Sequence, residues 1–61
     1  MKLKDYIELK RISKTRVAKE LKITPTYVYE ILAERMTPGR KLAQRIVKWS
    51  QGAVTFQDLW K

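Results

Sequence analysis

The sequence predicts an all-α fold of five short helices. Two observations carry this prediction: apolar residues recur at helical spacing along the chain, and each stripe follows a residue suited to begin a helix. These helix-starting signals are Ser13, Thr24-Pro25, Thr37-Pro38 and Thr55. A chain of 61 residues buries only a small core, so we expect residues 1–61 to form one domain that functions through its surface.

The first two helices are predicted on either side of Ser13. The apolar stripe of the first comprises Leu3, Tyr6 and Ile7, with Leu9 or Ile12 beyond. Ser13 is a favourable N-cap for the second helix, in which Val17, Ala18 and Leu21 share one face.

The third helix is predicted to begin directly after the second, at about residues 25–35. Proline disfavours α geometry at the residue before it but suits the first helical position, so Thr24 is the expected N-cap and Pro25 the first residue. Val28, Ile31 and Leu32 then face inward, which leaves a polar face exposed.

The C-terminal half is predicted to contain two more helices. Thr37-Pro38 is expected to open the fourth, whose apolar stripe comprises Leu42, Ala43, Ile46, Val47 and Trp49. Gly52 fits its end, and Thr55 with Asp58 forms a capping-box variant that starts a last short helix. The segment AVTF also fits a strand, but the long helical stripe before it favours the helical form.

Composition indicates a polyanionic partner. Fourteen Lys and Arg against six Asp and Glu give a formal net charge of +8, which makes nucleic acid the first candidate. The chain has no Cys and no His, and its carboxylates are scattered, so we expect no catalysis, metal site, cofactor or small-molecule ligand. No apolar stretch approaches the roughly 20 residues that span a membrane, so a cytoplasmic location is expected.

Residues 14–33 fit the pattern of a helix-turn-helix. Ala18 stands where two helices approach closely, Ile23 fills the turn, and Val28 and Ile31 pin the second helix onto the first. Lys22 departs from the pattern, because this turn position favours Gly, for which a positive φ costs little. We expect a strain of about 1 kcal/mol at Lys22.

The first 35 residues resemble the phage Cro repressors, through LKDY at Leu3–Tyr6 and KTRVAKEL at Lys14–Leu21. Residues 37–60 are similar to the helical half of Cro-like and YdaS-like prophage regulators. The resemblance implies a transcriptional repressor in a bacterial host cell that binds a pseudo-palindromic operator through the major groove. It also implies a weak homodimer that DNA strengthens, for which Phe56, Leu59 and Trp60 are candidate contacts.

The basic residues lie mostly outside the third helix, so phosphate contacts and base contacts are expected from different segments. Residues 1–23 carry eight basic and three acidic side chains, residues 24–36 one and two, and residues 37–61 five and one. The expected base-reading residues are Pro25, Thr26, Tyr29, Glu30 and Ala33, with Thr26 suited to a thymine methyl and Glu30 to cytosine N4. The expected backbone contacts are Lys14, Thr15, Thr24, Tyr27, Arg35, Arg40 and Lys41.

Other interpretations stay open at the level of sequence. Tyr27 also fits a core or rim aromatic, and the basic side chains also fit an ordinary solvated surface. A prophage antitoxin-like regulator would use the same helix and bind a protein as well. A helical interaction module with a basic surface is a further alternative, but it would not need an exposed polar helix face. A membrane-surface peptide is another, but capped turns would not interrupt its apolar residues.

Overall fold

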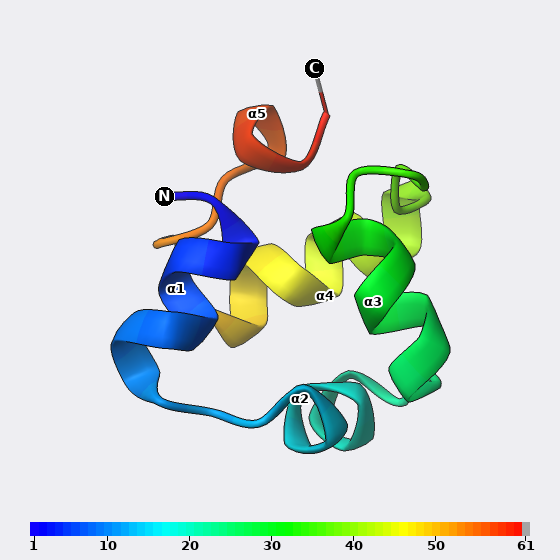
Figure 1. Cartoon of the computed structure of the whole chain (residues 1–61). Coiled ribbons are helices and arrows are strands. Elements are labelled where there is room, and N and C mark those ends of the chain that lie inside the picture. Colours follow the sequence, from blue (N-terminus) through cyan, green and yellow to red (C-terminus); the bar gives the residue numbers. More distant parts are fainter. Residues whose placement is uncertain (61) are drawn as a thin grey trace.

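The computed structural model describes residues 1–60, and within that range the chain is all-helical, as predicted (Figure 1). The five helices are α1 (Leu3–Lys10), α2 (Lys14–Leu21), α3 (Pro25–Leu32), α4 (Arg40–Trp49) and α5 (Phe56–Leu59). Residues 50–55 link α4 to α5 without forming a strand, and Val54 in this link is fully buried. Packing thus uses Val54 as a core residue rather than as part of a sheet.

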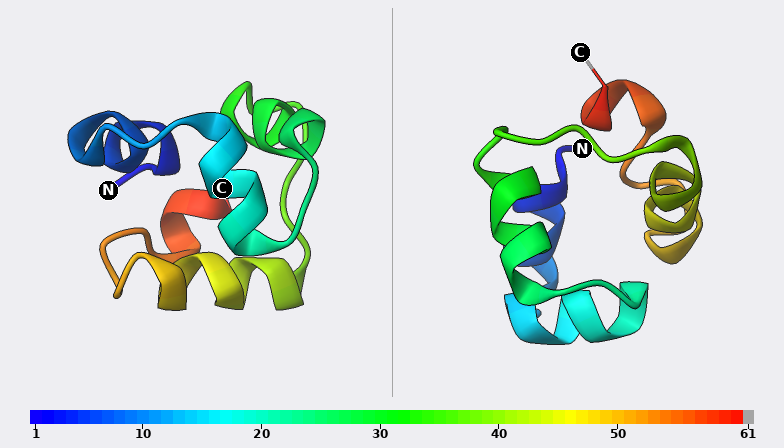
Figure 2. Two further views of the ribbon diagram at one scale, coloured as in Figure 1. Left: turned by 90° about the horizontal axis from the view of Figure 1, so that it is seen from below. Right: turned by 90° about the vertical axis from the view of Figure 1, so that its right-hand side faces the viewer.

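The core is made by all the helices except α5, together with the link before it. Seen from below, α4 lies along one side and α1 and α3 along the other, with α2 between them (Figure 2). The buried cluster comprises Leu3, Ile7, Val17, Ala18, Leu21, Val28, Ile31, Ile46 and Val54. Trp49 packs against it and meets Tyr6 edge-on, with ring centroids 5.3 Å apart.

The junction of α2 and α3 has the local geometry that its sequence predicts. Ser13 Oγ accepts from Arg16 N at 3.1 Å at the start of α2, and Thr24 Oγ1 accepts from Tyr27 N at 3.2 Å at the start of α3. Ala18 is only 1% exposed where α2 packs against α3. These contacts fix how α3 is presented to solvent.

Four helices end in a left-handed residue that is not glycine. These residues are Arg11, Lys22, Glu34 and Gln51, with φ between 55° and 60°. At Lys22, the next amide, Ile23 N, donates to Ala18 O at 2.9 Å, the long bond of a Schellman motif. The expected positive φ at Lys22 is confirmed, and the same strain is present at three further helix ends.

Two expected helix boundaries were wrong, and the core uses one of the two residues expected after Ile7. The fourth helix begins at Arg40 rather than Pro38, because Gly39 is extended and is the N-cap, and residues 37–39 lie outside any helix. The third helix ends at Leu32 rather than residue 35. After the fourth helix ends at Trp49, the chain turns through a left-handed Gln51, and Gly52 follows with φ 85°. Leu9 is 64% exposed, because Ile12 instead packs against the core after α1 ends.

The short helix α5 is fixed by its capping box. Asp58 Oδ2 accepts from Thr55 N and Thr55 Oγ1, both at 2.9 Å, and from the amino group of Met1 at 2.8 Å. The hydrogen bond from this amino group, followed by those from Thr55, lowers the pKa of Asp58 from 3.8 to about 2. The predicted Thr55–Asp58 capping box is confirmed, and it also joins α5 to the start of the chain.

Candidate nucleic-acid interface

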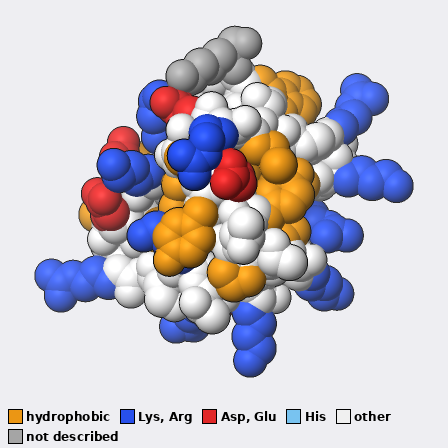
Figure 3. Space-filling view, turned by 45° about the vertical axis from the view of Figure 1, so that its right-hand side comes forward, with side chains coloured by type: hydrophobic (Ala, Val, Ile, Leu, Met, Phe, Trp, Pro, Cys, Tyr) orange, Lys and Arg blue, Asp and Glu red, His pale blue; other side chains and the backbone are white. Residues whose placement is uncertain are grey.

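The exposed face of α3 is polar and carries no basic residue. Thr26, Tyr29 and Ala33 lie on one stripe of this face at spacings of three and four residues, and all three are exposed. Pro25, also exposed, occupies the first position of the helix. In Figure 3, which turns the side bearing α3 forward, hydrophobic side chains lie in the middle of the view beside a basic and an acidic group, and further Lys and Arg project around its edge.

Tyr29 links this face to the start of α2. Its ring is 53% exposed, and Lys14 Nζ lies 5.4 Å from the ring centroid. A cation over an aromatic face at an exposed site is worth about 0.5–1 kcal/mol. The contact places an expected phosphate-binding group beside an expected base-reading group.

Glu30 and Arg35 form an ion pair at the end of α3. Arg35 Nε donates to Glu30 Oε2 at 2.9 Å and Arg35 Nη2 donates to Glu30 Oε1 at 3.4 Å. The hydrogen bond from Arg35 lowers the pKa of Glu30, and the same bond raises the pKa of Arg35. Glu30 therefore stays ionised, with both of its oxygens directed at the guanidinium.

Two helix starts flank α3 with basic side chains. Lys14 and Thr15 begin α2, Arg40 and Lys41 begin α4, and all four are exposed. The first amides of α4 have no side-chain cap, because their N-cap is Gly39. Unpaired amides, the positive end of the helix dipole and two cations together favour a phosphate. The start of α4 lies on the same side of the molecule as α3 (Figure 2, left).

Two of the expected backbone contacts have structural roles. Thr24 uses its hydroxyl to cap α3, and Tyr27 is half-buried against the core. The sequence already allowed a core or rim position for Tyr27, and that position is the one it occupies.

A second basic cluster was missed by the sequence analysis. Lys22, Arg45 and Lys48 line a hollow of about 270 Å³ between α2 and α4, beside Glu20 and Trp49. Trp49 Nε1 donates to Glu20 Oε1 at 2.7 Å, and this hydrogen bond, followed by that from Arg16, lowers the pKa of Glu20. The spacing of Arg45 and Lys48, three residues apart on one helix, was the available signal.

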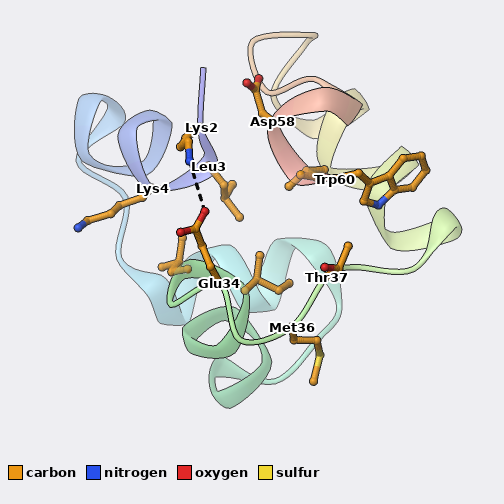
Figure 4. Close-up of a pocket in the computed structure, with 11 residues that line it drawn as sticks. Lys2, Leu3, Lys4, Glu34, Met36, Thr37, Asp58 and Trp60 are labelled. Atoms are coloured by element: carbon orange, nitrogen blue, oxygen red, sulfur yellow. Dashed lines mark hydrogen bonds and ion pairs between the residues drawn. The ribbon is translucent and has the colours of Figure 1, made fainter.

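A larger pocket of about 360 Å³ lies between the start of α1, the end of α3 and α5. Figure 4 shows Lys2 and Glu34 paired on one side of it and Trp60 on another. Lys2 Nζ is 3.3 Å from Glu34 Oε1, and Leu3, Ile31, Leu32, Met36 and Leu59 supply apolar lining. Met36 and Trp60 are 41% and 37% exposed, so the pocket borders an apolar surface.

Within residues 1–60, no group of three or more metal-ligating side chains comes together, and no helix is long and apolar enough to cross a membrane. Comparison of the chain with family models, curated proteins and solved structures gives no match.

Proposed function

We propose that this chain is a sequence-specific DNA-binding repressor of the phage Cro type, in which α2 and α3 form a helix-turn-helix and α3 enters the major groove. The observation that carries the proposal is the arrangement of charge around α3. Its exposed face bears Thr26, Tyr29 and a Glu30 paired with Arg35. The first-turn cations Lys14 of α2 and Arg40 and Lys41 of α4 form no ion pair within residues 1–60. A polar reading surface between phosphate contacts is the usual division of work in such complexes.

Major-groove insertion has a steric requirement that α3 meets. A helix enters the groove only if its outer face is free of other chain segments, and Tyr29, at the middle of α3, is 53% exposed. The adjoining α2 then lies across the sugar-phosphate backbone, with Lys14 and Thr15 at its first positions.

Salt-dependent titration is the direct test of phosphate contact. Wild-type protein and the Lys41→Ala variant are titrated with a random-sequence duplex at several salt concentrations. Lys41→Ala is expected to weaken binding and to reduce the slope of log affinity against log salt by about one unit. Lys19→Ala, which removes the same charge from the last turn of α2, is the matched control and is expected to leave the slope nearly unchanged.

Sequence reading needs a second measurement, in which the wild-type chain selects duplexes from a randomised pool. Enrichment of one pseudo-palindromic sequence supports a repressor that binds as a pair. DNA binding would be contradicted if the pool stayed random after several rounds and the affinity for DNA did not change with salt concentration.

Pairing of two copies is part of the proposal, because one module of this size buries little DNA surface. Phe56 and Trp60 are 38% and 37% exposed, and their rings contact each other at a tilt of 34° with centroids 5.1 Å apart. Sedimentation with and without the selected duplex tests this part: two copies per duplex and mostly monomer alone are the expected results.

An antitoxin-like regulator is the second candidate, and the apolar surface around α5 is what favours it. Met36, Phe56 and Trp60 are exposed beside the larger pocket, and a regulator that also binds a protein needs such a surface. Phe56→Ser tests for this role. The variant should no longer bind a protein partner, whereas the base sequence that one copy selects through α3 should stay the same.

A further inference from the structure

The ion pair between Arg35 and Glu30 leaves one edge of the guanidinium uncommitted. A guanidinium has five N–H donors, and the structure directs the Nε and Nη2 side at Glu30. Within residues 1–60 Arg35 has no other hydrogen-bond or ion-pair partner, and its side chain is 66% exposed. The fork formed by Nη1 and Nη2 therefore faces outward with parallel donors available.

The turn at the end of α3 is what brings these two side chains together. Glu34 takes a left-handed conformation with φ 60°, and Arg35 N donates to Glu30 O at 3.0 Å. This Schellman turn folds the chain back, so that residue 35 lies over residue 30 rather than continuing along the helix. Arg35 is thereby added to the exposed stripe that contains Thr26, Tyr29 and Ala33.

Electrostatics then decides which kind of DNA group suits this fork. The pair is neutral as a whole, and the Glu30 carboxylate lies about one hydrogen-bond length from the guanidinium, so an approaching phosphate meets attraction and repulsion together. A guanine presents two uncharged acceptors, O6 and N7, that match a guanidinium fork and are repelled much less by the carboxylate. Lys14, Arg40 and Lys41 differ, since no carboxylate pairs with any of them among residues 1–60.

We propose that Arg35 reads a guanine through its outer fork, with Glu30 as the positioning residue that holds the guanidinium in place. This inference rests on the proposed function and changes two of the roles expected from sequence. Arg35 moves from phosphate contact to base reading, and Glu30 acts on the DNA through Arg35 rather than by accepting from cytosine N4. The lowered pKa of Glu30 agrees with a carboxylate that stays charged against its partner.

The test begins with the duplex that the wild-type chain selects from a randomised pool. Affinities of the wild type, Arg35→Ala, Arg35→Lys and Glu30→Ala are then measured on this duplex, on the same duplex with single base-pair changes, and on random DNA. Every titration is repeated at several salt concentrations. Arg40→Ala serves as the matched phosphate-contact control.

Arg35→Ala is expected to remove a preference of about 5- to 100-fold for one guanine in each half-site, with the salt slope nearly unchanged. Arg35→Lys keeps the charge without the planar fork, so it should lose most of the same preference. Arg40→Ala is expected to weaken binding to all duplexes alike and to lower the slope by about one unit.

Glu30→Ala separates positioning from mere repulsion. It should reduce the preference at the same guanine, whereas affinity for random DNA should rise because a negative charge is gone. The Arg35→Ala, Glu30→Ala double variant should lose no more of this preference than Arg35→Ala alone, since both act on one contact.

Two results would overturn the inference while leaving the proposed function intact. One is an Arg35→Ala variant that selects the same sequence as the wild type but binds all duplexes more weakly with a slope lowered by about one unit. The other is an Arg35→Ala variant that keeps the full wild-type preference at every guanine of the duplex, because Arg35 would then read none of them. Failure of the wild type to select any sequence would instead count against DNA reading itself.

Discussion

Two Thr-Pro dipeptides flank α3, and only the first begins a helix. Thr24 caps α3 through its hydroxyl, with Pro25 exposed at the first helical position. Pro38 is buried and lies outside any helix, its carbonyl accepts from Trp60 Nε1 at 2.9 Å, and α4 begins two residues later. Proline has the same φ in a helix and in extended chain, so its ψ is set by neighbours. The second dipeptide takes its conformation from a contact 22 residues away.

The largest expected effect tests the junction that presents the first dipeptide. Ala18→Leu places three extra carbons where α2 packs against α3 at a residue 1% exposed, and overpacking of this kind costs about 1–3 kcal/mol. In a domain of this size the melting temperature should fall by more than about 5 °C, as measured by circular dichroism. Ala33→Leu, at an exposed position, is the control; equal melting temperatures for both variants would contradict this packing.

The comparison between the two dipeptides is tested by removing each hydroxyl in turn. Thr24→Ala should lower the free energy of unfolding by about 1 kcal/mol, because it leaves the Tyr27 amide without its cap. Thr37→Ala should change it by less than about 0.5 kcal/mol, since Thr37 caps no helix. Urea unfolding measures both, and equal losses would mean that the second threonine also starts a helix in solution.

Trp60→Phe tests the hydrogen bond that holds Pro38 outside the fourth helix. Phenylalanine keeps an aromatic ring but lacks the N–H that reaches the Pro38 carbonyl, so a loss of up to about 1 kcal/mol is expected. Amide exchange at residues 39–41 should also increase, because the start of α4 is less firmly placed. Trp49→Phe breaks a tryptophan contact to Glu20 elsewhere and should leave those amides unchanged.

Acid affects the α5 end of the molecule through Asp58. Its pKa is about 2 in the fold against an ordinary 3.8, so the folded state favours the charged form. The resulting stability is fully present above pH 4 and is lost as pH falls from about 4 to about 2. Glu20 and Glu30 also have lowered pKa values, so Asp58→Asn should reduce, not abolish, the fall in unfolding free energy measured by urea over this range.

Predictions from the sequence held where a signal depends on near neighbours. The caps at Ser13, Thr24 and Thr55 were predicted because each acts on an amide three residues along the chain. The end of the third helix and the start of the fourth were missed because they depend on a left-handed Glu34 and on a distant Trp60.

The candidate interface was predictable as a set of residues but not as a set of contacts. Tyr29 and Lys14 are 15 positions apart, and the spacing of Glu30 and Arg35 is five, outside the three or four that pair side chains along a helix. Only the turn at Glu34, seen in the structure, shows that Glu30 and Arg35 form an ion pair. The assignments of Pro25, Thr26 and Ala33 to base reading stay predictions.

The left-handed residues that end the helices make this small domain unusually open to thermal improvement. Arg11, Lys22 and Gln51 each carry a Cβ in a conformation that glycine adopts without strain, and none lies on the exposed face of α3. Replacing each by glycine removes about 1 kcal/mol of strain, partly offset by the greater freedom of an unfolded glycine. Gains of a few tenths of a kcal/mol per site would add, because the three helix ends are separate. Heat resistance could thus be engineered into the scaffold without altering a residue on the exposed face of α3, and only Lys22→Gly would remove a cation from the cluster between α2 and α4.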